Sequence, residues 1–462
     1  MDVFHSLMMG FSVALRPLNL GVAFAGCLVG TVIGVLPGIG PITGVAILVP
    51  LTFAIKLPPE SALILLAGIY YGAMYGGSTT SILLNVPGET ASVVTTIDGY
   101  QMARQGRAGP ALAISAIGSF IAGTISVIGL MLFGPFLANV AIRFGPAEYL
   151  ALMVFAFSMI SSLAGRNLAK AMISTLFGLM LATVGLDPGS AVPRYTFGQL
   201  KLYDGMDFLV VAIGLFAISE VLSLLEETHT GQTAKAEMGK VYISFKEFMF
   251  SLGAILRGSF LGFFIGVLPG AGASIASFIS YTLEKRVSNR NDTFGKGDIR
   301  GVAGPESANN AAAGGALIPL LTLGIPGSGT TAVLLGAIMG MNIVPGPLMF
   351  QQHPDVVWGL VASMYIGNLM LLVLNLPLVG LFVKILLIPN WFLIPAVTAI
   401  SFIGVYSVNN SPFDLLRLQA EDGLLESFGN QYSASDAHDQ HYPYVEKSPP
   451  AMLPDDVLNI LD

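Results

Sequence analysis

The chain has 462 residues, of which 54% are hydrophobic and only 11% are charged, and its mean hydropathy is +0.74. A soluble domain carries about 25% charged residues, so this composition excludes a water-soluble globular protein and predicts an all-α polytopic membrane protein. The formal net charge of −7 belongs mainly to the end of the chain, because residues 411–462 hold ten acidic residues and two basic ones.

The first predicted unit, residues 1–110, contains two broken apolar segments. The hexapeptide Ile-Gly-Val-Leu-Pro-Gly at Ile33–Gly38 ends a ladder of glycines at four-residue spacing that starts at Gly26. Further on, Tyr71–Gly77 leads through a run of hydroxyl residues to a second Pro-Gly break at Asn85–Thr90. Proline removes a backbone donor and glycine opens unusual backbone angles, so both sites interrupt a helix. A discontinuous helix and a re-entrant hairpin are equally compatible with these breaks.

Residues 111–225 follow as ordinary transmembrane helices, and residues 226–248 form a polar linker. Repeat 2, residues 249–410, then presents the hexapeptide again at Ile265–Gly270, 232 residues after the first copy and at the end of an identical glycine ladder. A second break follows at Leu323–Ser328. The glycine ladders themselves favour close helix packing. The whole chain is expected to contain about 10–12 membrane segments, and residues 411–462 are expected to be a disordered acidic tail.

Loop charges indicate that the two repeats are inverted. The loop between the broken segments holds a single lysine in repeat 1 (55–60) but five basic residues in repeat 2 (284–305). The loop after the second break shows the opposite bias, with two arginines in 99–109 and no lysine or arginine in 341–356. Basic loops mark the cytoplasmic side of a membrane. Equivalent loops are therefore expected on opposite sides, as in an inverted-topology repeat.

The four Pro-Gly breaks and the polar residues beside them form the candidate substrate- or ion-binding site. Irregular backbone inside a membrane must be buried in protein or line a cavity, and exposed amides suit anions while free carbonyls suit cations. The alternative is that these breaks only kink packed helices. The candidate residues are Gly38, Gly40, Thr43, Ser78, Thr79, Thr80, Asn85, Pro87, Gly88, Glu89, Gly270, Gly272, Ser274, Glu306, Asn309, Asn310, Pro326, Gly327, Ser328 and Thr330.

Two carboxylates in this set could carry a coupling ion or a proton. Glu89 directly follows a break, and Glu306 follows Pro305. Intramembrane carboxylates are costly and are therefore commonly functional. For Glu306, a place in the first turn of a helix that begins with Pro305 is an equal alternative.

Enzyme chemistry is not expected from this sequence. The single Cys27 and five scattered histidines offer no metal-ligand spacing, and no catalytic motif such as His-Glu-x-x-His occurs. No metal site is predicted, and Cys27 is expected to be a buried structural thiol.

Six segments carry a family resemblance: Gly34–Pro41, Tyr75–Thr80, Asn85–Glu89, Phe294–Gly297, Pro305–Ala311 and Leu323–Gly327. They resemble the large membrane subunit of the tripartite tricarboxylate transporter family, the TctA type, over residues 1 to about 415. The resemblance implies a multi-pass protein of the bacterial inner membrane that takes up tricarboxylates or related carboxylates, coupled to Na+ or H+ and without another cofactor. It also implies two partners, a small four-helix TctB-type membrane subunit and a periplasmic TctC-type solute-binding protein, and no nucleic acid.

Two alternatives accompany this interpretation. The protein could be an anion channel, or a permease for another organic anion that acts without a binding protein. After about residue 416 the chain departs from the family pattern, which predicts a truncated or frameshifted end, with a natural disordered tail as the alternative.

Overall fold

The protein is almost entirely helical. The computed structural model describes residues 3–36, 39–162, 168–187, 190–203, 205–206, 208–218, 240–288, 293–385, 395, 398–400, 402–403 and 406. Within them, one antiparallel pair of short strands, β1 (Gly185–Leu186) and β2 (Pro193–Arg194), accompanies the helices, so the predicted all-α class is confirmed. Gly38, residues 226–239 of the expected linker and the expected tail at 411–462 lie outside the described residues.

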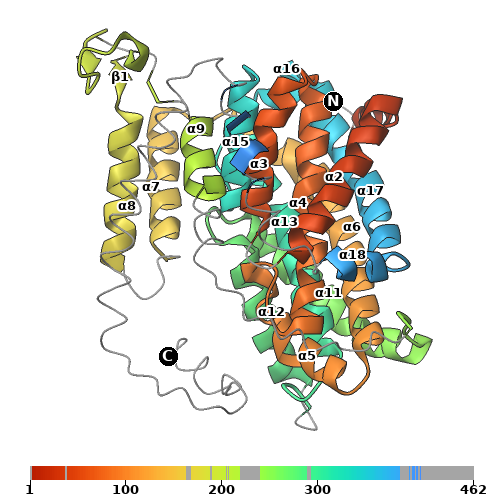
Figure 1. The fold of residues 1–462 in the computed structure, drawn as a ribbon. Helices are drawn as coiled ribbons and strands as arrows, with labels where there is room; N and C mark the ends of the chain where they lie inside the picture. Colours follow the sequence, from red (N-terminus) through yellow and green to blue (C-terminus); the bar gives the residue numbers. More distant parts are fainter. Residues whose placement is uncertain are drawn as a thin grey trace.

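The helices follow the predicted order along the chain (Figure 1). The first half contains α1 (Val3–Ala14), α2 (Pro17–Val35), α3 (Pro41–Ala54), α4 (Pro59–Leu84), the 3-10 turn η1 (Thr90–Ser92) and α5 (Thr95–Arg104). The connecting part contains α6 (Ala108–Ala141), α7 (Pro146–Ser162), α8 (Leu168–Ala182), the 3-10 turn η2 (Leu200–Leu202), α9 (Phe208–Ile213) and the π-helical turn η3 (Gly214–Ile218). The second half contains α11 (Phe245–Val267), α12 (Gly272–Ser288), α13 (Arg300–Gly315), α14 (Leu317–Leu323), α15 (Gly329–Gly340), α16 (Met349–Gln352), α17 (Pro354–Asn375) and α18 (Val379–Ile385).

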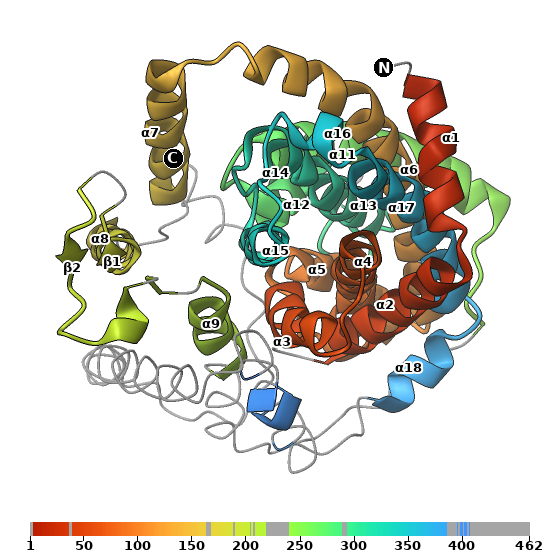
Figure 2. The same ribbon diagram turned by 90° about the horizontal axis from the view of Figure 1, so that it is seen from above.

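Four of the described helices, α2, α6, α11 and α17, are long and apolar enough to cross a membrane, and shorter apolar helices accompany them. Two other helices, α4 and α13, lie inside the bundle, where α4 packs against α2, α6 and α17, and α13 packs against α6 and α11 (Figure 2). Every residue of α13 from Gly301 to Gly315 is buried, although this helix is rich in small and polar residues rather than large apolar ones. One of the two central helices is therefore built of small and polar residues, whereas the other, α4, contributes large apolar residues to the core.

The glycine ladders pack α2 onto α4 and α11 onto α13 in the same way. A Cβ added at Gly26, Gly30 or Gly34 would clash with the backbone carbonyl of Leu65, Ile69 or Ala73 of α4. In the second half, a Cβ added at Gly258, Gly262 or Gly266 would clash with the carbonyl of Gly304, Ala308 or Ala312 of α13, respectively. These three carbonyl residues lie 239 positions after Leu65, Ile69 and Ala73. Only glycine allows backbones to approach this closely. The packing role predicted for the ladders is confirmed.

This contact pattern also decides how the first break of each half is built. Because residue numbers rise together along both helices of each pair, α2 runs parallel to α4, and α11 runs parallel to α13. The helix between them must therefore return, so α2–α3 and α11–α12 are helical hairpins that turn at the Pro-Gly break. The chain thus reverses direction at each break, and the re-entrant placement of these hairpins in the membrane stays a prediction.

Proline explains why these hairpins turn where they do. The residue before a proline is pushed out of helical angles. Leu36 and Leu268, which precede Pro37 and Pro269, are both extended (φ −80°, ψ 117° and φ −76°, ψ 122°), and each donates its N–H to the isoleucine carbonyl three residues earlier at 3.1 Å. The two copies therefore match at Leu36 and Leu268, the residues that lead into the break.

The second breaks are equally alike. Asn85 (φ 59°, ψ 24°) and Gly324 (φ 69°, ψ 24°) end α4 and α14 in left-handed backbone angles. Glu89 and Ser328 are then the N-cap residues of η1 and α15, and each backbone N–H donates to a hydroxyl three residues later. The two halves differ just before these breaks, because α4 is continuous whereas its counterpart is interrupted at Ala316, between α13 and α14. Pro319 has no backbone N–H and cannot donate to the Gly315 carbonyl.

The two central helices run in opposite directions. Tyr71 of α4 lies beside Gly314 of α13, whereas Ile82, further along α4, lies with Val302 near the start of α13, both beside Gly99 of α5. Figure 1 accordingly draws α3 and α15 in the upper part of the bundle and α5 and α12 in the lower part. The inverted membrane topology itself stays a prediction.

A buried aspartate joins the two halves at the lower end. Asp98 of α5 is completely buried, and its Oδ1 accepts three backbone N–H groups of the loop before α13, while Tyr281 donates to Oδ2 at 2.9 Å. The three donors are Gly295 at 2.9 Å, Gly297 at 2.8 Å and Asp298 at 2.8 Å. A carboxylate is the side chain suited to this task, because it can accept several hydrogen bonds at once.

Replacing Gly30 by alanine should destabilise the protein, because the new Cβ would clash with the Ile69 carbonyl and overpacking commonly costs about 1–3 kcal/mol. Gly21→Ala is the matched control, since Gly21 lies on the same helix with no atom within 4 Å of an added Cβ. Thermal unfolding in detergent should show a lower midpoint for Gly30→Ala only. Equal midpoints in the two variants would contradict the proposed backbone contact.

Replacing Asp98 by alanine should lower the unfolding midpoint more than Tyr281→Phe does. The first change leaves three backbone N–H groups without an acceptor, at about 1–3 kcal/mol each, whereas the second removes a single hydrogen bond. The same detergent assay measures both. A smaller effect for Asp98→Ala than for Tyr281→Phe would show that the loop does not depend on this carboxylate.

Candidate functional site

The two breaks of the second half touch each other. The backbone N–H of Gly270 donates to the carbonyl of Gly327 at 3.2 Å. Gly270 (φ 80°) and Gly272 (φ 67°) both have positive φ angles that favour glycine at this turn. The breaks at Pro269 and Pro326 therefore lie in contact, and their role in binding stays a prediction.

The breaks of the first half also lie close together. After α4 the chain doubles back, so that a Cβ at Gly88 would clash with the Gly34 carbonyl near the end of α2 and with Gly77 of α4. Thr80 Oγ1 would lie 2.8 Å from the same Cβ. Gly327 lies correspondingly against Ala316, 239 residues after Gly77. Because the backbone at Gly88 lies so close to Gly34 and Gly77, a residue with a Cβ does not fit at this position.

The two halves meet where their helices begin. Thr90, directly after the first-half break, has its Oγ1 2.8 Å from the Oγ of Ser274 in the first turn of α12. On the other side, an added Cβ at Gly329, the first residue of α15, would clash with Ile42 in the first turn of α3. The N-termini of α3, α12 and α15 therefore all lie at breaks that contact the opposite half. Helix N-termini carry free N–H groups and a positive dipole end, which suit an anion.

Glu89 and Glu306 lie in the buried part of this region. Glu89 is 7% exposed and Glu306 is 0% exposed. Asn309 donates its Nδ2 to Glu89 Oε1 at 2.7 Å, and Thr95 donates to Glu306 Oε1. Among the described residues, the side-chain partners of these two carboxylates are neutral. Glu306 lies inside α13, six residues after its start at Arg300, so the alternative of a helix-initiating Pro-Glu pair is wrong.

Asn310 completes the polar face of α13. Its Nδ2 donates to Ser119 Oγ at 2.7 Å and to the Glu306 carbonyl at 3.1 Å. Three oxygens on this face, Glu306 Oε2, Asn309 Oδ1 and Asn310 Oδ1, are buried and have no hydrogen-bond partner among the described residues. Buried polar atoms are normally paired, so these three atoms need an explanation.

Several predicted site residues have local roles in the structure. Asn85 closes α4 with its backbone, and its side chain is exposed. Ser78 donates to the Tyr75 carbonyl and accepts from Ser115, and Ser328 pairs with Thr331 in an N-capping box. For Gly40, Thr43, Thr79, Pro87 and Thr330 the position beside a break is clear, and their role in binding stays a prediction.

Three further polar residues hydrogen-bond candidate site residues and were not predicted from the sequence. Tyr70 places its hydroxyl 3.4 Å from Ser328 Oγ, while Thr95 and Ser119 hydrogen-bond Glu306 and Asn310. Tyr70 lies between apolar residues, and Ser119 sits on a long apolar helix, so neither stood out. The four-residue spacing of Ser115 and Ser119, one face of α6, was the available signal.

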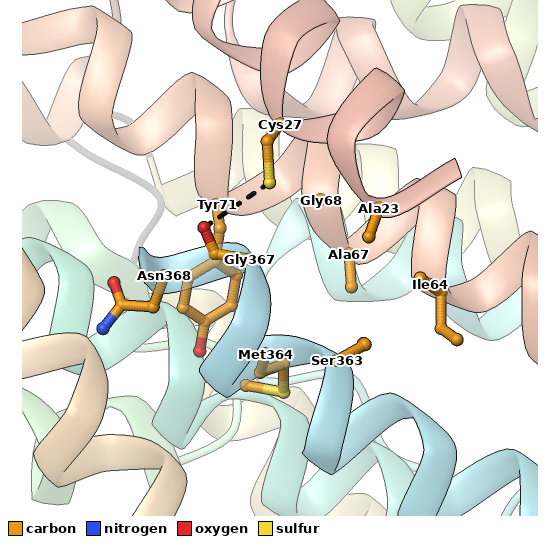
Figure 3. Close-up of a pocket in the computed structure, with 10 residues that line it drawn as sticks. All are labelled: Ala23, Cys27, Ile64, Ala67, Gly68, Tyr71, Ser363, Met364, Gly367 and Asn368. Carbon is orange, nitrogen blue, oxygen red and sulfur yellow. Dashed lines mark hydrogen bonds between the residues drawn. The ribbon is translucent and has the colours of Figure 1, made fainter. Parts of the chain in front are cut away.

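A small pocket lies elsewhere, between α2, α4 and α17 (Figure 3). It is bordered by Cys27, Tyr71 and Asn368 together with small and apolar residues, and none of the residues predicted for the site lines it. Cys27 is fully buried and donates to the Gly367 carbonyl at 3.6 Å, so the structural role expected for this thiol is confirmed.

The arrangement can therefore hold charges of both signs. Backbone amides at three helix N-termini suit an anion, and carboxylate and amide oxygens suit a hard cation. In the described part of the chain, no group of three or more His, Cys, Asp or Glu residues could bind a metal ion such as zinc.

Comparison with known proteins gives the family. The model of the tripartite tricarboxylate transporter TctA family matches residues 20–420. An uncharacterized 52.8 kDa protein of Agrobacterium vitis, from the TAR-I ttuC' 3' region, is 48% identical over 415 residues, which cover 90% of this chain and 82% of that protein. An uncharacterized protein from the TAR-II ttuC' 3' region of the same organism is 54% identical over 154 residues, or 33% of this chain and 64% of its own length.

No solved structure matches the chain. The family match spans both hairpins, both second breaks and the buried carboxylates between them. The resemblance indicated by the six sequence segments is therefore confirmed, and the protein is a multi-pass membrane protein that belongs to the tripartite tricarboxylate transporter TctA family.

Proposed function

We propose that this protein is the carrier subunit of a cation-coupled system that takes up tricarboxylates or related carboxylates across the bacterial inner membrane. The observation that carries the proposal is the meeting of the broken helices: Gly270 donates to the Gly327 carbonyl within the second half, and Thr90 Oγ1 lies 2.8 Å from Ser274 Oγ across the two halves. Broken helices that point their N-termini at a buried site are a common way for transporters to hold an anion.

In the proposed arrangement, the carboxylates of the substrate bind the free amides at the starts of α3, α12 and α15. Gly40, the N-cap of α3, makes no side-chain cap, so the first N–H groups of that helix are not used by a capping side chain. The neighbouring hydroxyls of Thr90 and Ser274 add neutral donors. Hydrogen bonds to a carboxylate are stronger than bonds between neutral groups, which favours an anionic ligand.

An inverted topology supports alternating access in this proposal. The antiparallel course of α4 and α13, and the placement of α3 and α12 at opposite ends of the bundle, agree with the opposite charge bias of equivalent loops. The end that carries Lys285 and Arg286 of α12 and Arg104 of α5 would face the cytoplasm. Motion of one half against the other would then open the site to either side.

Two partners complete the proposed system. The family is described as tripartite, which supports a small TctB-type membrane subunit and a TctC-type periplasmic protein that delivers the substrate. Large apolar side chains on α11, such as Phe260 and Phe264, are more than half exposed and suit a lipid or helix neighbour.

Uptake by the reconstituted system tests this function. The protein, combined with a TctB-type and a TctC-type subunit in liposomes, should accumulate radiolabelled carboxylates from a panel that starts with citrate. Uptake should saturate, be competed by related carboxylates and require both a cation gradient and the binding protein. Flux that neither saturates nor is competed would instead favour the channel alternative, and uptake without the binding protein would favour a simple permease.

Replacing Gly270 by valine should reduce this uptake more than tenfold while the protein remains in the membrane. A β-branched side chain is strongly disfavoured at φ 80°, and a shift of the turn would break the bond from Gly270 to Gly327. The same outcome is predicted for Gly38 from its equivalent place in the sequence.

Gly21→Ala serves as the control for this experiment, because an added Cβ at Gly21 meets no atom within 4 Å. Membrane abundance is compared by immunoblotting in all variants. Full uptake by Gly270→Val would remove the break around Pro269 from the proposed site.

A further inference from the structure

The charges of Glu89 and Glu306 are not balanced by any basic partner in the described part of the structure. Glu306 is completely buried, and its Oε1 accepts from the neutral hydroxyl of Thr95. Glu89 is nearly buried, and its Oε1 accepts from the neutral amide of Asn309. Uncompensated carboxylates in a low-dielectric interior are strongly disfavoured, so a positive charge or a proton must accompany them.

The hydrogen bonds of the two asparagines determine where their amide oxygens lie. Asn309 must turn its NH2 group toward Glu89, because a carboxylate only accepts. Asn310 must turn its NH2 group toward the Glu306 carbonyl for the same reason. Both Oδ1 atoms therefore point away from these acceptors, and both are buried and unpartnered, as is Glu306 Oε2.

The residues that carry these three oxygens share one face of α13. Residues 306, 309 and 310 are related by three- and four-residue steps, which place side chains on the same side of a helix. The set consists of one carboxylate oxygen and two amide oxygens, all of them acceptors. Ser307 Oγ on the same helix is also buried without a partner.

A proton does not satisfy this set. Protonation of Glu306 would supply one O–H donor, which can pair with a single amide oxygen and would leave the other without a partner. A hard metal cation, by contrast, can bind carboxylate and amide oxygens together. Since the unpaired set contains only one carboxylate, a monovalent ion balances it better than Ca2+ or Mg2+.

We propose that Glu306, Asn309 and Asn310 bind a sodium ion through these three oxygens, and that this ion is the coupling ion of the carrier. The coupling part of the inference depends on the proposed function, whereas the binding part does not. Asn309 connects the ion to Glu89, which is the N-cap residue at the first-half break. Sodium binding would therefore neutralise negative charge beside the place where a carboxylate substrate is held.

Sodium binding to the purified full-length protein tests the site without any carboxylate present. Thermal unfolding in detergent is measured over a series of NaCl concentrations, with choline chloride added to keep the ionic strength constant, and binding is measured directly with 22Na+. The parent protein should show a saturable rise of the unfolding midpoint with Na+. Glu306→Gln and Asn310→Ala should each weaken the apparent Na+ affinity at least tenfold, because each removes a ligand oxygen.

Glu148→Gln is the matched control, since Glu148 is an exposed glutamate at the start of α7, and its Na+ affinity should equal that of the parent. The same midpoint in NaCl and in choline chloride for the parent would overturn the site without requiring any variant to fold. Parent-like Na+ affinity in both site variants would also overturn it.

Uptake measured separately distinguishes the two proposals. Carboxylate uptake that runs fully on a pH gradient in sodium-free buffer would overturn sodium coupling and leave the carrier function intact. Sodium binding that depends on Glu306, in a protein that carries no carboxylate of the panel, would support the ion site and overturn the proposed function.

Discussion

The contact between glycine ladders and backbone carbonyls is the constraint on which the rest of the structure depends. Gly30 against Ile69 and Gly262 against Ala308 bring two helices to backbone distance in each half. At that separation no side chain fits between the helices, so their relative register is determined by the glycine spacing alone. The register in turn determines how far along the neighbouring helix each hairpin turns. The turns of α2–α3 and α11–α12 thereby lie next to the second break of their own half.

The second consequence of this packing is a centre that is dense and polar at once. Small residues dominate α13, where Glu306, Asn309 and Asn310 are all completely buried. Large apolar side chains on α11 such as Phe260 and Phe264 are exposed on the outside of the protein. Here the membrane supplies the apolar surroundings, and the interior can be used for chemistry.

Much of this architecture was predictable, because the duplicated motifs are short-range signals. Pro37, Pro87, Pro269 and Pro326 interrupt helices through their own rings, so the breaks could be predicted without knowledge of the fold. The hairpin return of α3 and α12 could not, since it follows from contacts between residues such as Gly34 and Ala73 that are far apart in the chain. The burial of Asp98 against the loop before α13 could not be predicted either, because its contacts are made across 197 to 200 residues. Tyr70, Thr95 and Ser119 were missed for the same reason.

The equivalent N-cap positions Glu89 and Ser328 show what a duplication permits. Both residues start a helical turn with similar backbone angles (φ −149°, ψ 164° and φ −156°, ψ 170°), so the exchange of a hydroxyl for a carboxylate left the backbone of the N-cap unchanged. It changed the charge, because one copy of the loop is anionic and the other is neutral. The two N-cap positions therefore match in backbone geometry and differ in charge, so the asymmetry between them is encoded in a side chain rather than in the backbone.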